Sequence, residues 1–154
     1  MHDTSSRGEP RPAGSGAGGM TARGVKGGGA LALLRVVAAL ACLETLVQGL
    51  LAGMLLNGDV ASIDPHGINA YVFELLVSLQ VVAAVLVWRG NRRLTWPLKA
   101  AVGILAATFT QTALGLASSL AAHVTLGVAL CAMETVLVVR AFTLRSDHPV
   151  SIPA

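Results

Sequence analysis

Long apolar runs separated by short polar segments dominate the chain from residue 31 onward. They extend from Leu31 to Leu56, from Ile68 to Trp88 and from Leu98 to Phe142. A helix needs about 20 residues to cross the hydrocarbon core of a bilayer, so each of the first two runs matches one span. The third run would measure about 67 Å as a single helix, about twice the core thickness, and must fold back on itself.

The turn within the third run is predicted near Gly115 and the pair Ser118–Ser119, the turn-forming cluster closest to its middle. Backbone groups in lipid must be satisfied within each segment, so every span is expected to be helical. We therefore predict an all-α fold, an integral membrane four-helix antiparallel bundle within residues 30–143. Its helices are expected at about 31–56, 66–88, 97–117 and 120–142.

Both ends of the chain differ from this apolar region. Residues 1–29 are rich in Gly, Pro, Ser and Arg and carry few bulky apolar side chains, which predicts a disordered cytoplasmic N-terminal tail. Residues 144–154 are expected to form a short cytoplasmic tail. Met20 is an alternative start to Met1, and the sequence does not distinguish them.

The distribution of basic residues predicts the orientation in the membrane. All eleven Lys and Arg fall on one side of a four-span arrangement, whereas Asp59 and Asp64 lie on the other. Basic residues concentrate in cytoplasmic segments, so both termini are expected inside. Trp88 and Trp96 bracket the cytoplasmic loop, as aromatic residues at a membrane interface do. The predicted location is the cytoplasmic (plasma) membrane, with multiple spans.

Composition supports a membrane protein and excludes several function classes. Hydrophobic residues make up 54% of the 154 residues and charged residues 12%, about half the charged share of a soluble domain. The net charge of +3 is small and its basic residues flank apolar runs, so no nucleic-acid partner is expected. The chain carries no phosphate-binding loop and no hydrolase or zinc-protease motif, so it is not expected to be an enzyme on its own.

Two histidines are the strongest candidates for a site. Asp64 is predicted to cap the second helix with Pro65 as its first residue, which places His66 in the first turn. Ser119 is predicted to cap the fourth helix, which places His123 in its first turn. Both helices start on the outer side, so the two imidazoles are expected within about 3 Å in depth. If these helices are diagonal partners, the imidazoles can ligate a haem iron from opposite faces. Alternatively, each histidine lies at the interface and binds nothing.

A resemblance to a known family bears on the same residues. Gln111-Thr112-Ala113-Leu114-Gly115, followed by His123, Gly127 and Leu130, resembles the Q-x-x-L-G…H-x-x-x-G-x-x-L pattern of haem A synthases. The start of the second helix is also similar to uncharacterised small four-span actinobacterial membrane proteins. The resemblance implies a unit of half the haem A synthase size, with His66 and His123 as axial ligands of haem b. The family's Glu and Arg around the second-helix histidine are replaced by Ile63 and Gly67, so only the histidine pair carries over.

Three carboxylates fall inside predicted spans: Glu44, Glu74 and Glu134. Ionisable groups at membrane depth are costly, so they face protein or water and often serve a function. They can form a proton or ion relay or contact a propionate or substrate. Alternatively, they hydrogen-bond Gln48, Gln80, Gln111 or neighbouring hydroxyls as structural contacts between helices. Both alternatives stay open from the sequence.

Three functions fit these observations. The leading one is a small b-type haem protein for electron transfer or haem handling, with a membrane redox or assembly partner. The second is a non-catalytic membrane accessory protein without a cofactor, and the weakest is a transporter that uses the three carboxylates. The G-x-x-x-G spacing of Gly49 and Gly53 permits close helix approach, within the bundle or in a homo-oligomer.

Overall fold

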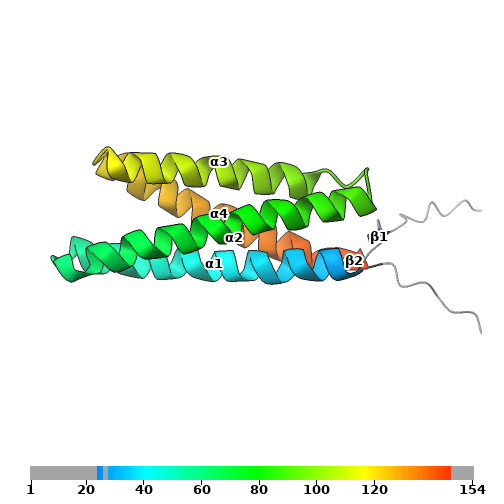
Figure 1. Ribbon diagram of the computed structural model, residues 1–154, viewed down its shortest axis with the longest axis horizontal. Helices are drawn as coiled ribbons and strands as arrows, with labels where there is room; N and C mark the ends of the chain where they lie inside the picture. Colours follow the sequence, from blue (N-terminus) through cyan, green and yellow to red (C-terminus); the bar gives the residue numbers. More distant parts are fainter. Residues whose placement is uncertain (1–23, 26–27, 147–154) are drawn as a thin grey trace, which may run out of the picture.

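The computed structural model describes residues 24–25 and 28–146 as an elongated helical bundle (Figure 1). Four helices and one short 3-10 turn make up nearly all of it. In chain order the elements are β1 (Gly24–Val25), α1 (Gly28–Leu56), η1 (Val60–Ser62), α2 (Ile63–Gly90), α3 (Trp96–Leu116), α4 (Leu120–Thr143) and β2 (Arg145–Ser146).

All four helices are long and apolar enough to cross a membrane. The shortest, α3, has 21 residues and measures about 31 Å at the usual helical rise, close to the thickness of a bilayer core. Large apolar side chains remain exposed on each helix, for example Leu50 at 65% and Val128 at 68%. Such surfaces suit contact with lipid tails, so the chain has the properties of a multi-pass membrane protein.

The four helices form a ring in which consecutive helices are in contact and the last helix contacts the first. α1 packs against α2 and α4, and α3 packs against the same two helices. Helices α2 and α4 therefore lie on one diagonal of the bundle. Consecutive helices run in opposite directions, so β1, β2 and the α2–α3 loop share one end (Figure 1). We call this the basic end, and the opposite end, with η1 and the α3–α4 turn, the histidine end.

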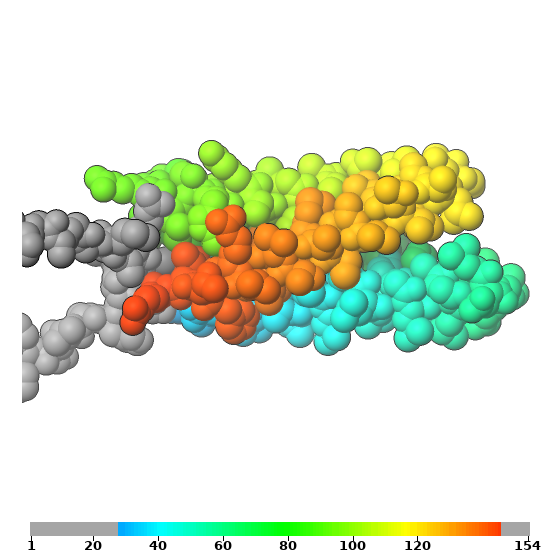
Figure 2. Space-filling view, turned by 180° about the vertical axis from the view of Figure 1, so that it is seen from behind, coloured from blue at the N-terminus to red at the C-terminus, as the bar shows by residue number. Residues whose placement is uncertain are grey.

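The buried core is concentrated in the half of the bundle toward the basic end. Leu34 of α1, Val87 of α2 and Ala141 of α4 are fully buried there, and a second cluster around Val77 and Leu137 reaches the middle of the bundle. Among the described residues that lie nearer the histidine end than both clusters, Ser62 is the one whose side chain is buried. Figure 2 shows the consequence, since the α3–α4 and α1–α2 hairpins are separated by a hollow at that end.

Cationic side chains hold the basic end together. Arg35 of α1 donates hydrogen bonds to two carbonyl oxygens at the end of α4, those of Ala141 (3.1 Å) and Leu144 (2.6 Å). Its guanidinium carbon also lies 5.5 Å from the centre of the Phe142 ring. These contacts satisfy carbonyls that a helix C-terminus leaves unpaired, and they join the first helix to the last.

The helix starts differ in detail from the sequence prediction. Asp64 is not the cap of α2, because the helix begins at Ile63. Ser62 occupies the cap position, but its side chain makes no hydrogen bond to the first turn of α2. The capping carboxylate is Asp59, which accepts hydrogen bonds from the Ala61 amide and the Ser62 hydroxyl at the start of η1. The extra turn η1 was not predicted, and it places Asp64 and Pro65 inside the first turn of α2.

The predicted tails extend less far than expected. Gly28 and Gly29, assigned to the tail, are the first residues of α1. Gly24–Val25 and Arg145–Ser146 form a short parallel pair, so these residues of both expected tails are ordered together. The rest of the predicted tails, residues 1–23, 26–27 and 147–154, including Met20, lies outside the described residues.

The G-x-x-x-G spacing in α1 has no packing role inside this chain. A Cβ atom built at Gly49 or Gly53 meets no other atom within 4 Å. No neighbouring helix of the described chain therefore approaches closely over these glycines. The interior alternative of the sequence analysis is excluded for this structure, and a contact between protomers stays a prediction.

Candidate functional site

The structure brings His66 and His123 together between the diagonal helices α2 and α4. Each histidine is the fourth residue of its helix, and both are half-buried. Their ring centroids lie 6.1 Å apart with an angle of 63° between the ring planes. The equal depth expected from the sequence therefore corresponds to direct proximity of the two imidazoles.

The local turns place both side chains at this depth. Before α4, Ser118 adopts a left-handed backbone conformation with φ 56°, and the amide of His123 donates to the carbonyl of Ser119 over 2.9 Å. Before α2, Gly58 adopts φ 91° ahead of η1, which redirects the chain from α1. Both connections are short, so each helix start is set by a tight turn.

The orientation of the His123 ring is fixed by α3. Its Nδ1 lies 2.9 Å from the carbonyl oxygen of Gln111, a contact in which Nδ1 must carry the proton and donate. The other nitrogen, Nε2, is then the one with a free lone pair. A hydrogen bond from Nδ1 to a backbone carbonyl is the usual outer-shell partner of a histidine that binds a metal through Nε2.

Gly115 makes room for the same ring. A Cβ atom at this position would lie 3.0 Å from Cε1 and 3.1 Å from Nδ1 of His123. The imidazole thus packs directly against the backbone of α3. Even a methyl group at this position would require the ring to shift by a few tenths of an ångström.

His66 has a different environment. Its Nδ1 is buried and has no hydrogen-bond partner among the described residues. A buried polar nitrogen without a partner is costly, and such groups in native structures call for a ligand, a water molecule or an ion. The two histidines therefore present one ring oriented by α3 and one ring whose buried Nδ1 lacks a hydrogen-bond partner among the described residues.

Two of the three membrane carboxylates form interhelical hydrogen bonds. Glu134 is fully buried and accepts a hydrogen bond of 3.2 Å from the amide of Gln80, which is also fully buried. Glu74 accepts a hydrogen bond of 2.7 Å from the hydroxyl of Thr112. For these two residues the contacts agree with the prediction that the carboxylates form structural hydrogen bonds between helices. Glu44 differs, because its Oε2 is buried without a partner among the described residues.

The polar interior has more acceptors than donors. Gln111 packs its amide nitrogen against Gly127, where a Cβ would lie 3.0 Å away, and leaves its Oε1 unpaired. Five buried oxygens and two buried nitrogens of the described residues lack partners. The oxygens belong to Glu44, Gln48, Gln80, Gln111 and Glu134, and the nitrogens belong to His66 and Asn69.

A metal ion held by side chains alone is not supported by the described residues. They contain no group of three or more His, Cys, Asp or Glu side chains arranged to hold an ion. Haem requires fewer protein ligands, because its ring nitrogens supply four and the protein completes the two axial positions. A pair of histidines on facing helices is sufficient for that role.

Some features of the site have no clear signal in the sequence. Gly115 was assigned to the turn, but α3 continues to Leu116 and the glycine serves to seat the imidazole. Three glutamines and neighbouring hydroxyls were candidate partners of the carboxylates, but the sequence did not assign Thr112 to Glu74 or Gln80 to Glu134. Spacing along a helix gives depth in the membrane, whereas partner choice also depends on helix rotation.

Comparison with protein-family models, curated proteins and solved structures finds no match to this chain. The resemblance to haem A synthases rests on its short motifs alone. The function is therefore argued from the geometry of the site.

Proposed function

We propose that this protein is a small b-type haem protein of the cytoplasmic membrane, with His66 and His123 as axial ligands. The observation that carries the proposal is the approach of the two imidazoles to 6.1 Å across the diagonal of the bundle. An imidazole nitrogen binds a metal at about 2 Å, so two rings on opposite sides of one ion have centroids about 6 Å apart. The observed separation matches that requirement.

The surroundings of the two rings also fit. The Gln111 carbonyl leaves Nε2 of His123 available, and Nδ1 of His66 is buried without a hydrogen-bond partner among the described residues. The hollow at the histidine end separates the hairpins that carry the ligands (Figure 2). This end has no Lys or Arg among the described residues, so its fit to haem rests on the imidazoles and the apolar helix surfaces.

Two protein ligands would occupy both axial positions of the iron, which favours electron transfer or haem handling over oxygen chemistry at the iron. The chain's own residues then have defined tasks. Gln111 orients one ligand, Gly115 admits it, and the helix starts at Ile63 and Leu120 set the depth of both.

The proposed orientation is an antiparallel bundle with the basic end, and both termini, in the cytoplasm. The described Lys and Arg that support this are Arg35, Arg89, Arg92, Arg93, Lys99, Arg140 and Arg145. Figure 1 shows that the α2–α3 loop and both described chain ends lie at one end of the bundle. Basic residues are retained in the cytoplasm during insertion, so the histidine end would face outside.

The test is a dithionite-reduced minus oxidised visible spectrum of the detergent-purified protein from a haem-sufficient host. Wild type is expected to show the α-band of b-type haem, and His66→Ala and His123→Ala to lose it. His148→Ala is the matched control and should keep the band. A folded, colourless wild type that added haem does not reconstitute would overturn the proposal. The remaining candidate would then be a membrane accessory or assembly protein, sought through copurifying partners.

A further inference from the structure

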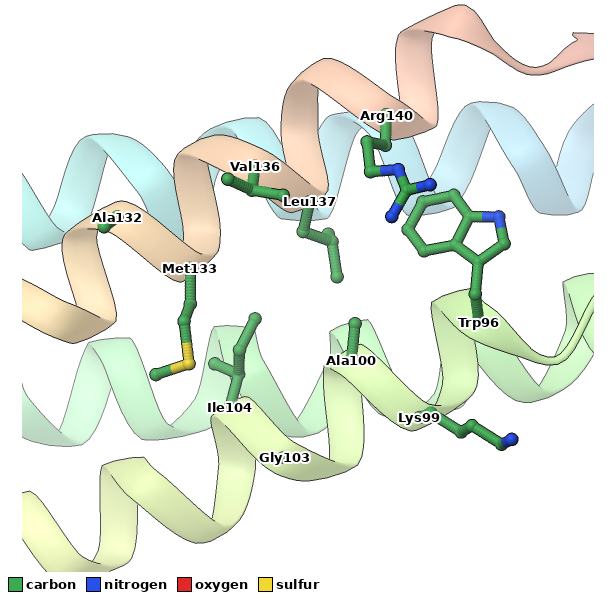
Figure 3. A pocket seen from close by; sticks show the side chains of 10 residues that line it. All are labelled: Trp96, Lys99, Ala100, Gly103, Ile104, Ala132, Met133, Val136, Leu137 and Arg140. Atoms are coloured by element: carbon green, nitrogen blue, oxygen red, sulfur yellow. The ribbon is translucent and has the colours of Figure 1, made fainter.

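A groove runs between α3 and α4 in the half of the bundle near the basic end, far from the histidines along both helices (Figure 3). Its volume is about 380 Å³. The floor is formed by core residues, including Ile104 and Leu137, which are 2% and 1% exposed. Gly103, Met133 and Val136 line it and are exposed, so the groove opens on the outside of the bundle.

The groove exists because small residues line part of it. A Cβ built at Gly103 meets no atom within 4 Å, and Ala100 and Ala132 add little volume to the walls. On a helix surface that faces lipid, such a groove accepts a flexible apolar chain. From Met133 to Arg140 it extends along about 10 Å of α4.

One end of the groove is cationic and aromatic. The guanidinium of Arg140 lies 5.0 Å from the centre of the Trp96 ring, whereas Lys99 also lines the groove but its side chain extends away from Arg140 (Figure 3). Neither cation has an acidic partner among the described residues, whose carboxylates lie at the histidine end or in the interior of the spans. Trp at this level is typical of the boundary between lipid tails and headgroups.

We infer that this groove binds an anionic phospholipid, with one acyl chain along its apolar floor and the phosphate beside Arg140. The combination of an apolar groove with an arginine that has no acidic partner among the described residues matches the two chemical parts of such a lipid. A zwitterionic lipid has the same acyl chains, but its headgroup has no net negative charge to attract Arg140. The inference does not depend on haem binding.

The test is native mass spectrometry of the full-length protein in detergent, titrated with phosphatidylglycerol or with phosphatidylcholine of identical acyl chains. Phosphatidylglycerol is expected to bind severalfold more tightly. Arg140→Gln should weaken its binding about fivefold, the effect of one cation near a membrane surface. Gly103→Leu adds a side chain where a Cβ meets no atom within 4 Å, and it should also weaken binding by filling the apolar part of the groove.

Arg92→Gln provides a matched control. Arg92 stacks on Trp88 at 4.1 Å at the same end of the bundle, but neither residue lines the groove. This variant should bind phosphatidylglycerol like wild type. Equal binding of the two lipids, or unchanged binding in both Gly103→Leu and Arg140→Gln, would overturn the inference. Full displacement of the lipid by glycerol 3-phosphate would also overturn it, because the site would then recognise free phosphate rather than lipid.

Discussion

Gly115 lies directly against the imidazole of His123, so that the position of a proposed ligand depends on the absence of a side chain on a neighbouring helix. The nearest ring atom is 3.0 Å from where a Cβ would stand. The relationship joins α3 to α4 at the point where the two diagonal histidines meet.

Replacing Gly115 by Ala is expected to displace the His123 ring and weaken haem binding about tenfold or more, while the bundle stays folded. Loss of outer-shell support around a metal ligand typically costs 10- to 100-fold in affinity. The measurement is a haem titration followed at the Soret band. Gly103→Ala is the control, since its Cβ meets no atom within 4 Å, and it should bind haem like wild type. Equal affinities for the two variants would show that Gly115 does not position the ring.

Replacing Gln80 by Met is expected to destabilise the bundle by about 1–3 kcal/mol, because the buried carboxyl of Glu134 loses its hydrogen-bond donor. The double variant Gln80→Met/Glu134→Met removes both polar groups and should recover most of this loss. Unfolding in mixed micelles with increasing dodecyl sulfate, followed by circular dichroism, measures both. A double variant less stable than the single one would contradict this account of the pair.

Ser118→Gly is expected to stabilise the protein by about 0.5–1 kcal/mol. A left-handed conformation costs a non-glycine residue about 1–2 kcal/mol, and this gain exceeds the entropy that glycine adds to the unfolded chain. The same unfolding assay applies. Ser119→Gly is the adjacent control: its φ is −83°, so glycine relieves no strain there and should change stability by a few tenths of a kcal/mol. A loss of stability in Ser118→Gly would show that the turn is not strained.

The proposed orientation predicts opposite labelling of two cysteine variants. In a background with Cys42→Ala and Cys131→Ala, Asn57→Cys at the histidine end should react with a membrane-impermeant maleimide in intact cells. Arg93→Cys in the α2–α3 loop should react only after the membrane is permeabilised. Both positions are exposed, so access rather than burial decides the outcome. The reverse pattern would place the basic end outside.

The helices were predictable to within a few residues at most ends, because apolar run lengths and turn residues define spans in a membrane. The prediction placed the second helix at residue 66, whereas α2 begins at Ile63 and is preceded by η1. Only Asp64 was predicted as a cap of the second helix. In the structure Asp59 caps η1, an extra turn that was not predicted from the sequence.

The candidate site was predictable in depth but not in its contacts. Rise per residue is constant in a helix, so His66 and His123 were expected at one level. The seat of His123 on Gly115 and the partner of Glu74 depend on how α3 is rotated, which the apolar sequence of that helix does not specify. The groove beside Trp96 was missed for the same reason, since its lining comes from two helices.

The hydrogen bonds of Arg35 also set an order for biosynthesis. Its acceptors, Ala141 and Leu144, lie 106 and 109 residues later in the chain, so the ring of helices closes only after the last span has been made. A chain that ends before Ala141 lacks both of these acceptors. The contact between the first and last helices therefore requires a complete α4.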